Sequence, residues 1–179
     1  MNTETIETKN LRLIPHSPQH ILALIEGADL YARSFGWPPA NGLRDFYVSK
    51  DVSPQWLAQL QSATVGDPWR HGFGVVHVAS GQVIGSAGFK GPPGEDGAVE
   101  IAYGIVPDYQ GKGYASEAAA ALVDFAFESG RVRVARAHTL AQKNASTRVL
   151  TKCGFEFAGE FVDPEDGAVW RWEKVLRRV

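Results

Sequence analysis

Apolar residues recur in the middle of the chain with the spacing of an amphipathic helix. From Tyr114 to Ser129 they fall on one helical face, while Glu117, Asp124 and Glu128 share the opposite face. The apolar face starts with small side chains and ends with bulkier ones: Ala115, Ala118, Ala119, Leu122, Phe125 and Ala126. The pattern predicts a helix over 114–129 whose first turns can lie close to their neighbours.

The segment Ala98–Val106, before this helix, alternates as a strand does. One face is apolar or aromatic, made of Val99, Ile101, Tyr103 and Ile105. The other face carries a lone carboxylate, Glu100, beside Ala102 and Gly104. The strand therefore places a single acid next to small residues that leave room beside it.

Similar patterns predict the remaining elements. Further strands are expected over Leu11–Ile14, Gly72–Ala79, Gln82–Phe89, Val132–Thr139, Phe155–Phe161 and Val169–Val175. Ser17 and Ser53, each followed by proline, predict helix starts, and Ser146–Cys153 predicts a helix that Gly154 ends. This order predicts an α/β (α+β) fold with a mixed sheet, antiparallel at both ends, with one right-handed strand-helix-strand crossover in the middle.

The loop Gln110-Gly111-Lys112-Gly113-Tyr114-Ala115 joins the strand to the long helix. A helix N-terminus presents backbone N–H groups without partners, and glycines remove the Cβ atoms that would block a phosphate. A P-loop is excluded, since its spacing and its hydroxyl residue are missing. A dinucleotide fingerprint is disfavoured, because Ser116 replaces its third glycine and the next strand has no terminal acid. The segment predicts a site for an anionic cofactor, with a simple turn as the alternative.

The composition of the 179 residues fits one domain, 1–179, since 44% are hydrophobic. A net charge of -2 lacks the basic surface that nucleic acid requires. Without a signal peptide or a membrane span in the pattern, a cytoplasmic protein with no membrane partner is expected. The single cysteine, Cys153, fits a reducing compartment. The histidines lack metal-ligand spacing, so no metal is expected, and His77 and His138 are expected to be strand residues with local partners.

Three ordered motifs carry a resemblance to a known family. Gln110-x-x-Gly113-x-Ala115 matches the acetyl-CoA signature Gln/Arg-x-x-Gly-x-Gly/Ala of the GNAT N-acetyltransferase superfamily. Glu100-Ile101-x-Tyr103-x-Ile105 precedes it, and Ser146-x-x-Val149-Leu150-x-Lys152-x-Gly154-Phe155 follows it. Together they resemble the branch of the ribosomal-protein N-terminal acetyltransferases (RimJ/RimL type), from about Arg12 to Trp172.

The resemblance implies a GNAT fold, with a twisted, mostly antiparallel sheet of about seven strands, flanking helices and a splayed parallel pair. In this family the pantetheine arm of acetyl-CoA lies between the splayed strands, where a bulge exposes amides. Gly104 suits that bulge, and the N–H of Val106 is expected to donate to the acetyl carbonyl. The implied cofactor-binding residues are Ile105, Val106, Gln110, Gly111, Lys112, Gly113, Tyr114, Ala115, Ser116 and Asn144.

Acetyl transfer to an amine requires a base, because most amines are protonated at neutral pH. Glu100 is the expected base and also an acceptor contact; an ordinary solvated glutamate fits the strand pattern equally well, and the family position favours catalysis. Ser146 stands where the family has a proton donor for the CoA thiolate, with helix capping as the alternative. Lys143 occupies the family's asparagine position. Either Asn144 contacts the pantetheine arm after a one-residue shift, or it only caps the helix.

The resemblance leaves the amine acceptor open between a protein N-terminal α-amine and a small molecule. The loop around Trp37 resembles the substrate-side loop of the family, so Trp37 is an expected acceptor contact. Arg148 and Lys152 are expected to face solvent, and a homodimer is consistent with the branch. The expected function is direct acetyl transfer in a ternary complex. A non-catalytic acyl-CoA-binding module of the same fold is the alternative.

Overall fold

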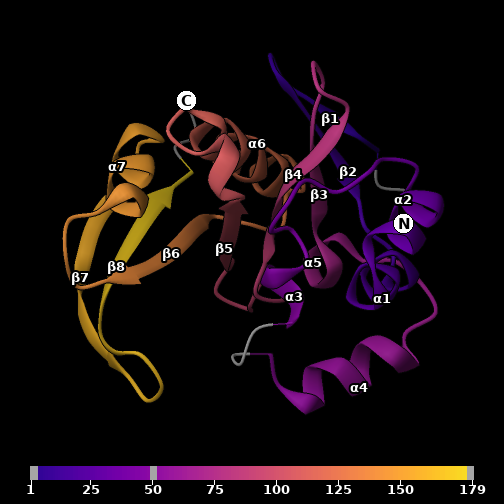
Figure 1. The fold of residues 1–179 in the computed structure, drawn as a ribbon. Coiled ribbons are helices and arrows are strands. Elements are labelled where there is room, and N and C mark those ends of the chain that lie inside the picture. The colour runs from indigo at the N-terminus through magenta and orange to yellow at the C-terminus, as the bar shows by residue number, and fades with distance from the viewer. Residues whose placement is uncertain (1–3, 49–51, 177–179) are drawn as a thin grey trace.

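The computed structural model describes residues 4–48 and 52–176, which form a mixed sheet of eight strands in the order β1-β2-β3-β4-β5-β6-β8-β7 (Figure 1). The strands are β1 (Ile6–Glu7), β2 (Leu11–Pro15), β3 (Phe73–His77), β4 (Gln82–Phe89), β5 (Ala98–Ile105), β6 (Val134–Leu140), β7 (Glu156–Asp163) and β8 (Gly167–Val175). The helices are α1 (Pro18–Glu26), α2 (Ala28–Phe35), α3 (Asp45–Val48), α4 (Pro54–Ser62), α5 (Pro68–His71), the 3-10 helix η1 (Pro107–Tyr109), α6 (Tyr114–Glu128) and α7 (Ala145–Lys152). The expected mixed α/β fold is confirmed, with the short β1 as an additional strand.

Local sequence signals fix the starts of α1 and α4, as predicted. The side-chain oxygen of Ser17 accepts the N–H of His20 at 3.1 Å, and that of Ser53 accepts the N–H of Trp56 at 3.0 Å. Each serine thus satisfies an N–H group that has no partner inside its helix. The proline after each serine occupies the first turn, where a missing N–H costs nothing.

The parallel strands β5 and β6 pair over a short stretch and then separate. The paired residues are Ala98 with Val134, Val99 with Ala135, and Glu100 with Arg136. Beyond Glu100, β5 pairs only with β4 as far as Ile105, and β6 pairs only with β8 as far as Leu140. Within the described residues, the facing edges of 101–105 and 137–140 have no strand partner. This is the splayed pair that the resemblance implies.

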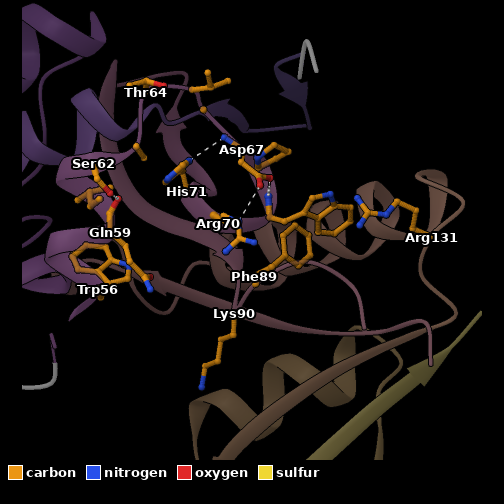
Figure 2. Close-up of a pocket in the computed structure, with 17 residues that line it drawn as sticks. Trp56, Gln59, Ser62, Thr64, Asp67, Arg70, His71, Phe89, Lys90 and Arg131 are labelled. Atoms are coloured by element: carbon orange, nitrogen blue, oxygen red, sulfur yellow. Dashed lines mark hydrogen bonds and ion pairs between the residues drawn. The ribbon is translucent and has the colours of Figure 1, made fainter. Parts of the chain in front are cut away.

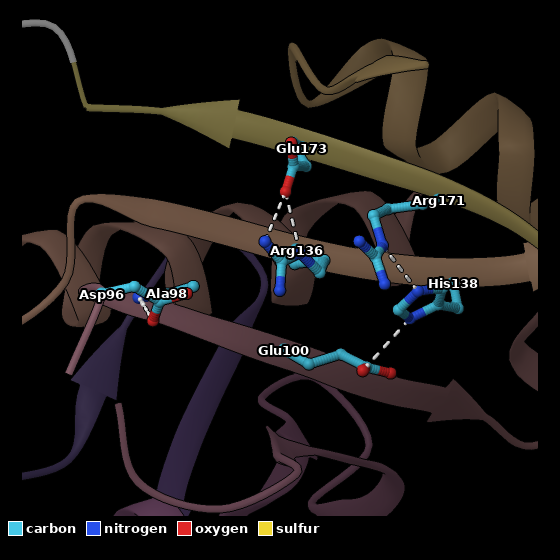
Figure 3. A network of polar contacts seen from close by, with 7 residues as sticks. All are labelled: Asp96, Ala98, Glu100, Arg136, His138, Arg171 and Glu173. Atoms are coloured by element: carbon cyan, nitrogen blue, oxygen red, sulfur yellow. Dashed lines mark hydrogen bonds and ion pairs between the residues drawn. The ribbon is translucent and has the colours of Figure 1, made fainter. Parts of the chain in front are cut away.

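Helices cover the two faces of the sheet differently. α6 crosses from β5 to β6 over one face and buries Ala118, Ala119 and Leu122 completely, which confirms the predicted helix and its small first turns. On the opposite face, α2 and α3 contact β3, β4 and β5; for example, the Tyr47 hydroxyl of α3 lies 2.6 Å from the Ser86 hydroxyl of β4. Charged side chains of β5, β6 and β8 continue this second face (Figure 3).

Three helices, α2, α3 and α5, were not predicted. α2 has Gly27 as its N-cap and no side-chain cap, and α3 and α5 have 4 residues each, too few to show a period. α5 nevertheless carries a local start signal, since Asp67 caps it and Pro68 follows. The predicted bulge at Gly104 is wrong, because β4 and β5 pair in continuous register from Gly85 with Ile105 to Phe89 with Ile101. Strand separation here occurs on the other edge of β5 and needs no bulge.

His16 is a buried titratable side chain on the face covered by α1 and α2. It is 2% exposed, its Nε2 lies 2.6 Å from the Tyr31 hydroxyl, and its Nδ1 has no partner within the described residues. Burial, with smaller contributions from His20 and His71, lowers the pKa of His16 from 6.5 to about 3. Folding therefore keeps this imidazole neutral where the unfolded chain would protonate it.

We expect this burial to make the protein acid-sensitive. Since the folded pKa of His16 is depressed, its contribution to stability is complete above pH 6.5 and is lost as the pH falls towards 3. The free energy of unfolding should fall by about 1.4 kcal/mol per pH unit from this group. Chemical denaturation over this range should show a shallower slope for His16→Gln than for the wild type. Equal slopes would contradict the assignment.

Candidate active site

The loop after β5 presents free backbone N–H groups. Gly111 and Gly113 have φ values of +77° and +87°, which glycine adopts without strain. A Cβ built on Gly111 would meet nothing within 4 Å, so the loop surface is open. Within the part of the chain that the structure describes, no acceptor is found for the N–H groups of residues 111–116. The start of α6 thus has the geometry of an anion site.

Side chains hold this loop in place and add charge to it. The Gln110 Nε2 donates to the Ile105 carbonyl at 2.8 Å and so ties the loop to the end of β5. The Tyr114 hydroxyl lies 3.0 Å from the Nε2 of His77, which confirms that His77 is a strand residue with local partners. The Lys152 Nζ lies 3.9 Å from a Cβ built on Gly113. Lys152 is exposed, as expected, but the structure directs its ammonium to the loop.

The unpaired edge of β5 offers backbone groups of alternate residues. The Val106 N–H donates to the Ile84 carbonyl at 2.8 Å and so points towards β4. The prediction that this N–H serves the acetyl carbonyl is therefore wrong, because it is already engaged. Since backbone groups alternate along a strand, those of Tyr103 and Ile105 point to the gap beside β6. Their N–H groups are the donors that this edge provides.

Glu100 lies at the last residue pair before the strands separate, on the face opposite α6. Its side chain is 22% exposed; Oε1 lies 3.1 Å from His138 Nδ1 (Figure 3), and Oε2 lies 2.9 Å from Lys90 Nζ. Arg136, the register partner of Glu100, instead binds Glu173 through Nε at 2.8 Å and Nη2 at 2.7 Å. His138 is thus a strand residue with local partners, as expected. The structure places a carboxylate beside the strand gap, with a nitrogen group on each oxygen.

The start of α7 separates the two roles considered for Asn144 and Ser146. Asn144 is the N-cap: its Oδ1 accepts the Thr147 N–H at 3.0 Å, and its own N–H donates to Thr147 Oγ1 at 3.0 Å. Ser146, in the first turn, is therefore not the capping residue. Instead, its side chain contacts Tyr103, whose pKa burial raises to about 12 while Ser146 acts in the opposite direction.

The face opposite α6 is hollowed beside β5. A pocket of about 310 Å³ is lined by Ala102 and Gly104 of β5 and by the aromatic residues Phe46, Tyr47 and Trp56. It shares several lining residues with a larger pocket of about 1100 Å³ that extends along α4 and α5. Figure 2 shows Trp56 and Gln59 on one side of this larger pocket and Arg131 on the other.

Trp37 lies elsewhere, beside the β3–β4 turn, where its ring is 3.8 Å from a Cβ built on Gly81. It is not among the described residues that line either of these two pockets, and its expected acceptor contact stays a prediction. Tyr47 and Trp56 supply aromatic walls of the pocket beside β5. The sequence pattern did not indicate this position for Trp56, because its spacing is that of an inward-facing residue of an amphipathic helix.

The described residues contain no cluster of histidine, cysteine or acidic side chains that could hold a metal ion. Among the helices of these same residues, none is long and apolar enough to cross a bilayer.

A family model described as "Acetyltransferase (GNAT) domain" matches residues 10–156. The chain belongs to the GNAT acetyltransferase family. A relative named "Uncharacterized N-acetyltransferase p20", from Bacillus licheniformis, is 31% identical over 142 residues, 79% of this chain and 80% of the relative. These findings confirm the family resemblance and the enzyme class drawn from the motifs.

Solved structures share the fold of this GNAT acetyltransferase. A RimL ribosomal L7/L12 alpha-N-protein acetyltransferase in complex with coenzyme A superposes with a TM-score of 0.68 at 17% identity, over 97% of this chain and 98% of that one. A ribosomal-protein-S5-alanine acetyltransferase from Vibrio fischeri gives a TM-score of 0.66 at 17% identity, over 97% of each chain. Identities this low show a shared fold and no more.

The site fits the chemistry of coenzyme A. The unpartnered N–H groups of residues 111–116 suit a diphosphate, and Lys152 adds a positive charge beside them. The unpaired strand edges beyond Glu100 suit a chain that carries amide groups, such as the pantetheine arm. The GNAT acetyltransferase thus has donors for both parts of such a molecule.

The N-cap of α7 predicts a local stability effect. Asn144→Ala removes the acceptor for the Thr147 N–H and should lower the free energy of unfolding by about 1 kcal/mol. Lys143→Ala, one residue earlier and exposed, serves as the control and should change stability by less than about 0.5 kcal/mol. Thermal unfolding compares the two. Similar losses for both would mean that the cap contributes nothing specific.

Proposed function

We propose that the protein transfers the acetyl group of acetyl-CoA to a primary amine by direct transfer in a ternary complex. The observation that carries the proposal is the position of Glu100, where β5 and β6 separate, with free loop N–H groups at the far end of the same strand. When bound, acetyl-CoA would supply an activated thioester. The chain would then position that thioester, align the amine and remove its proton.

In this proposal the residues around the gap between β5 and β6 have different roles. The N–H groups of residues 111–116 and Lys152 hold the diphosphate, and the N–H groups of Tyr103 and Ile105 donate into the gap. Glu100 accepts a proton from the amine, directly or through water, because only the neutral amine is a nucleophile. Ser146, which contacts the Tyr103 hydroxyl and is free of capping, is the candidate proton donor to the thiolate.

For the acceptor we propose a polypeptide N-terminal α-amine. The two pockets that share Trp56, Arg70 and His71 are open to solvent, and the larger, about 1100 Å³, is lined along α4 and α5, away from β5. A small amine would leave most of this space empty, whereas an extended peptide would fill it. The aromatic walls of Tyr47 and Trp56 suit the first residues of such a peptide. A small-molecule amine remains the second outcome of an acceptor screen.

Replacing the proposed base, Glu100, should abolish most acetyl transfer and leave acetyl-CoA binding intact. Glu100→Gln keeps the shape of the side chain but cannot accept a proton, so turnover should fall by roughly 10²–10⁴-fold. Release of CoA should be followed with short peptides and small amines as acceptors, and acetyl-CoA affinity should be measured by calorimetry. Unchanged affinity with little turnover is expected. Binding without turnover by the wild type on every amine would favour a non-catalytic binding module.

The glycine loop predicts a selective loss of cofactor affinity. Gly113→Ala places a methyl group at a left-handed residue of the loop, so acetyl-CoA affinity should fall about tenfold or more. Gly130→Ala is the matched control, since Gly130 follows the other end of α6 with a φ of +76° and open space around it. Calorimetry should show weaker binding for the first variant alone. Equal affinities would place the diphosphate elsewhere.

A further inference from the structure

The two oxygens of the Glu100 carboxylate have unlike partners. Oε2 meets the ammonium of Lys90, whose side chain is 61% exposed, so this long chain can exchange with solvent. Oε1 meets Nδ1 of His138, whose side chain is 21% exposed and stands on the neighbouring strand β6. The ammonium on Oε2 can therefore be displaced, whereas Oε1 is hydrogen-bonded to a short side chain with a rigid ring.

Arg171 determines which nitrogen of His138 carries the proton. The Arg171 Nε lies 3.1 Å from His138 Nε2 and donates to it, because a guanidinium has no acceptor (Figure 3). Nε2 must then present its lone pair, so the neutral ring carries its proton on Nδ1 and donates it to Glu100. Arg171 is itself fixed, since its Cζ lies 4.0 Å from the centroid of the Phe161 ring.

The contact between His138 and Glu100 joins β5 and β6 just beyond the point where their backbone pairing ends. Glu100 with Arg136 is the last pair of β5 and β6, and His138 lies two residues further along, beyond it. In β8, Arg171 is the direct register partner of His138, so strand pairing aligns these two side chains. The register of β8 on β6 thus places the imidazole, and the imidazole reaches across to Glu100.

The other charged groups on this face do not replace His138. The Arg136 guanidinium, though opposite Glu100 in register, binds Glu173 Oε2 with two nitrogens. Arg171 is directed to the imidazole. Among the described residues Lys90 is the remaining cation on Glu100; it binds Oε2, and its side chain also lines the larger pocket.

From these contacts we propose that His138, in a tautomer set by Arg171, is a positioning residue that holds Glu100 in place for proton transfer from the acceptor amine. The inference rests on the proposed function. The His138 hydrogen bond keeps Oε1 as an acceptor and turns Oε2 to the amine, which enters by displacing Lys90. The amine N–H bond then breaks and an O–H bond forms at Oε2. The proton of His138 stays on Nδ1 throughout.

Two substitutions of His138 separate positioning from packing. His138→Asn retains an N–H donor near the position of Nδ1, whereas His138→Phe fills the space without a donor. The phenylalanine variant should lose about tenfold in kcat with little change in KM for acetyl-CoA, the size expected for a hydrogen bond to a charged group. The asparagine variant should recover most of that loss. Equal activity of the two variants would overturn the proposal.

The partner of the other carboxylate oxygen gives a second readout. Lys90→Gln uncovers Oε2 of Glu100 and should lower KM for the amine, whereas His138→Phe should act on kcat. Arg136, Arg171 and Glu173 remain unchanged around Glu100 in both variants. A loss in His138→Phe that appears only as a higher KM for the amine would contradict the proposal.

A double-mutant cycle tests whether His138 acts through Glu100. In a Glu100→Gln background, His138→Phe should cause little further loss, whereas two independent roles would give additive losses. Nitrogen-15 NMR of the free protein provides a readout without turnover: the ring of His138 should be protonated on Nδ1, and Arg171→Met should weaken that preference. Full activity of Glu100→Gln would refute the proposed base itself. A strong effect of Glu100→Gln with additive losses would refute only the role of His138.

Discussion

The structure depends on the early end of parallel pairing between β5 and β6. A sheet normally satisfies the N–H and C=O groups of both edges of a central strand, and leaving them unpaired is costly unless water or a ligand replaces the partner. Here the pairing stops after Glu100, although both strands continue in the sheet through their outer neighbours. One carbonyl of the exposed edge, that of Ile105, is covered by the Gln110 side chain. The remaining edge is available to a polar chain, and the proposed function assigns this opening to the pantetheine arm of coenzyme A.

The elements nearest this opening were the ones that the sequence predicted well. The helix after the glycine loop has a strong period and alanines in its first turns, and it appears as α6 with Ala118 and Ala119 fully buried. The loop glycines adopt left-handed conformations, as a tight turn before a helix requires. These features are encoded locally, in residues adjacent along the chain. For the same reason Glu100 could be assigned to the open face of its strand from alternation alone.

The features that the sequence did not reveal depend on contacts between distant segments. The acceptor of the Val106 N–H is the Ile84 carbonyl, because of how the end of β5 aligns with β4. A local sequence pattern does not indicate the register between two strands. Trp56 rather than Trp37 lines the pocket beside β5, because the paths of the connecting segments decide which aromatic side chain reaches it. The contacts of His138 with Glu100 and Arg171 require three strands to be aligned, and the sequence could indicate only that His138 has partners nearby.

Small residues on the open face of β5 explain how an aromatic wall can stand so close to the reacting region. A Cβ built on Gly104 would lie 3.0 Å from two carbons of the Phe46 ring, and one built on Gly85 would lie 2.3 Å from the Gly104 carbonyl. Larger side chains at either position would push α3 away from the sheet or separate β4 from β5. Gly104 therefore allows the Phe46 ring to lie directly over β5, and the width of the pocket beside this strand follows from that close approach. Gly85 instead allows β4 and β5 to pair closely. In the proposed function, Gly104 thus sets acceptor size as much as the aromatic rings themselves.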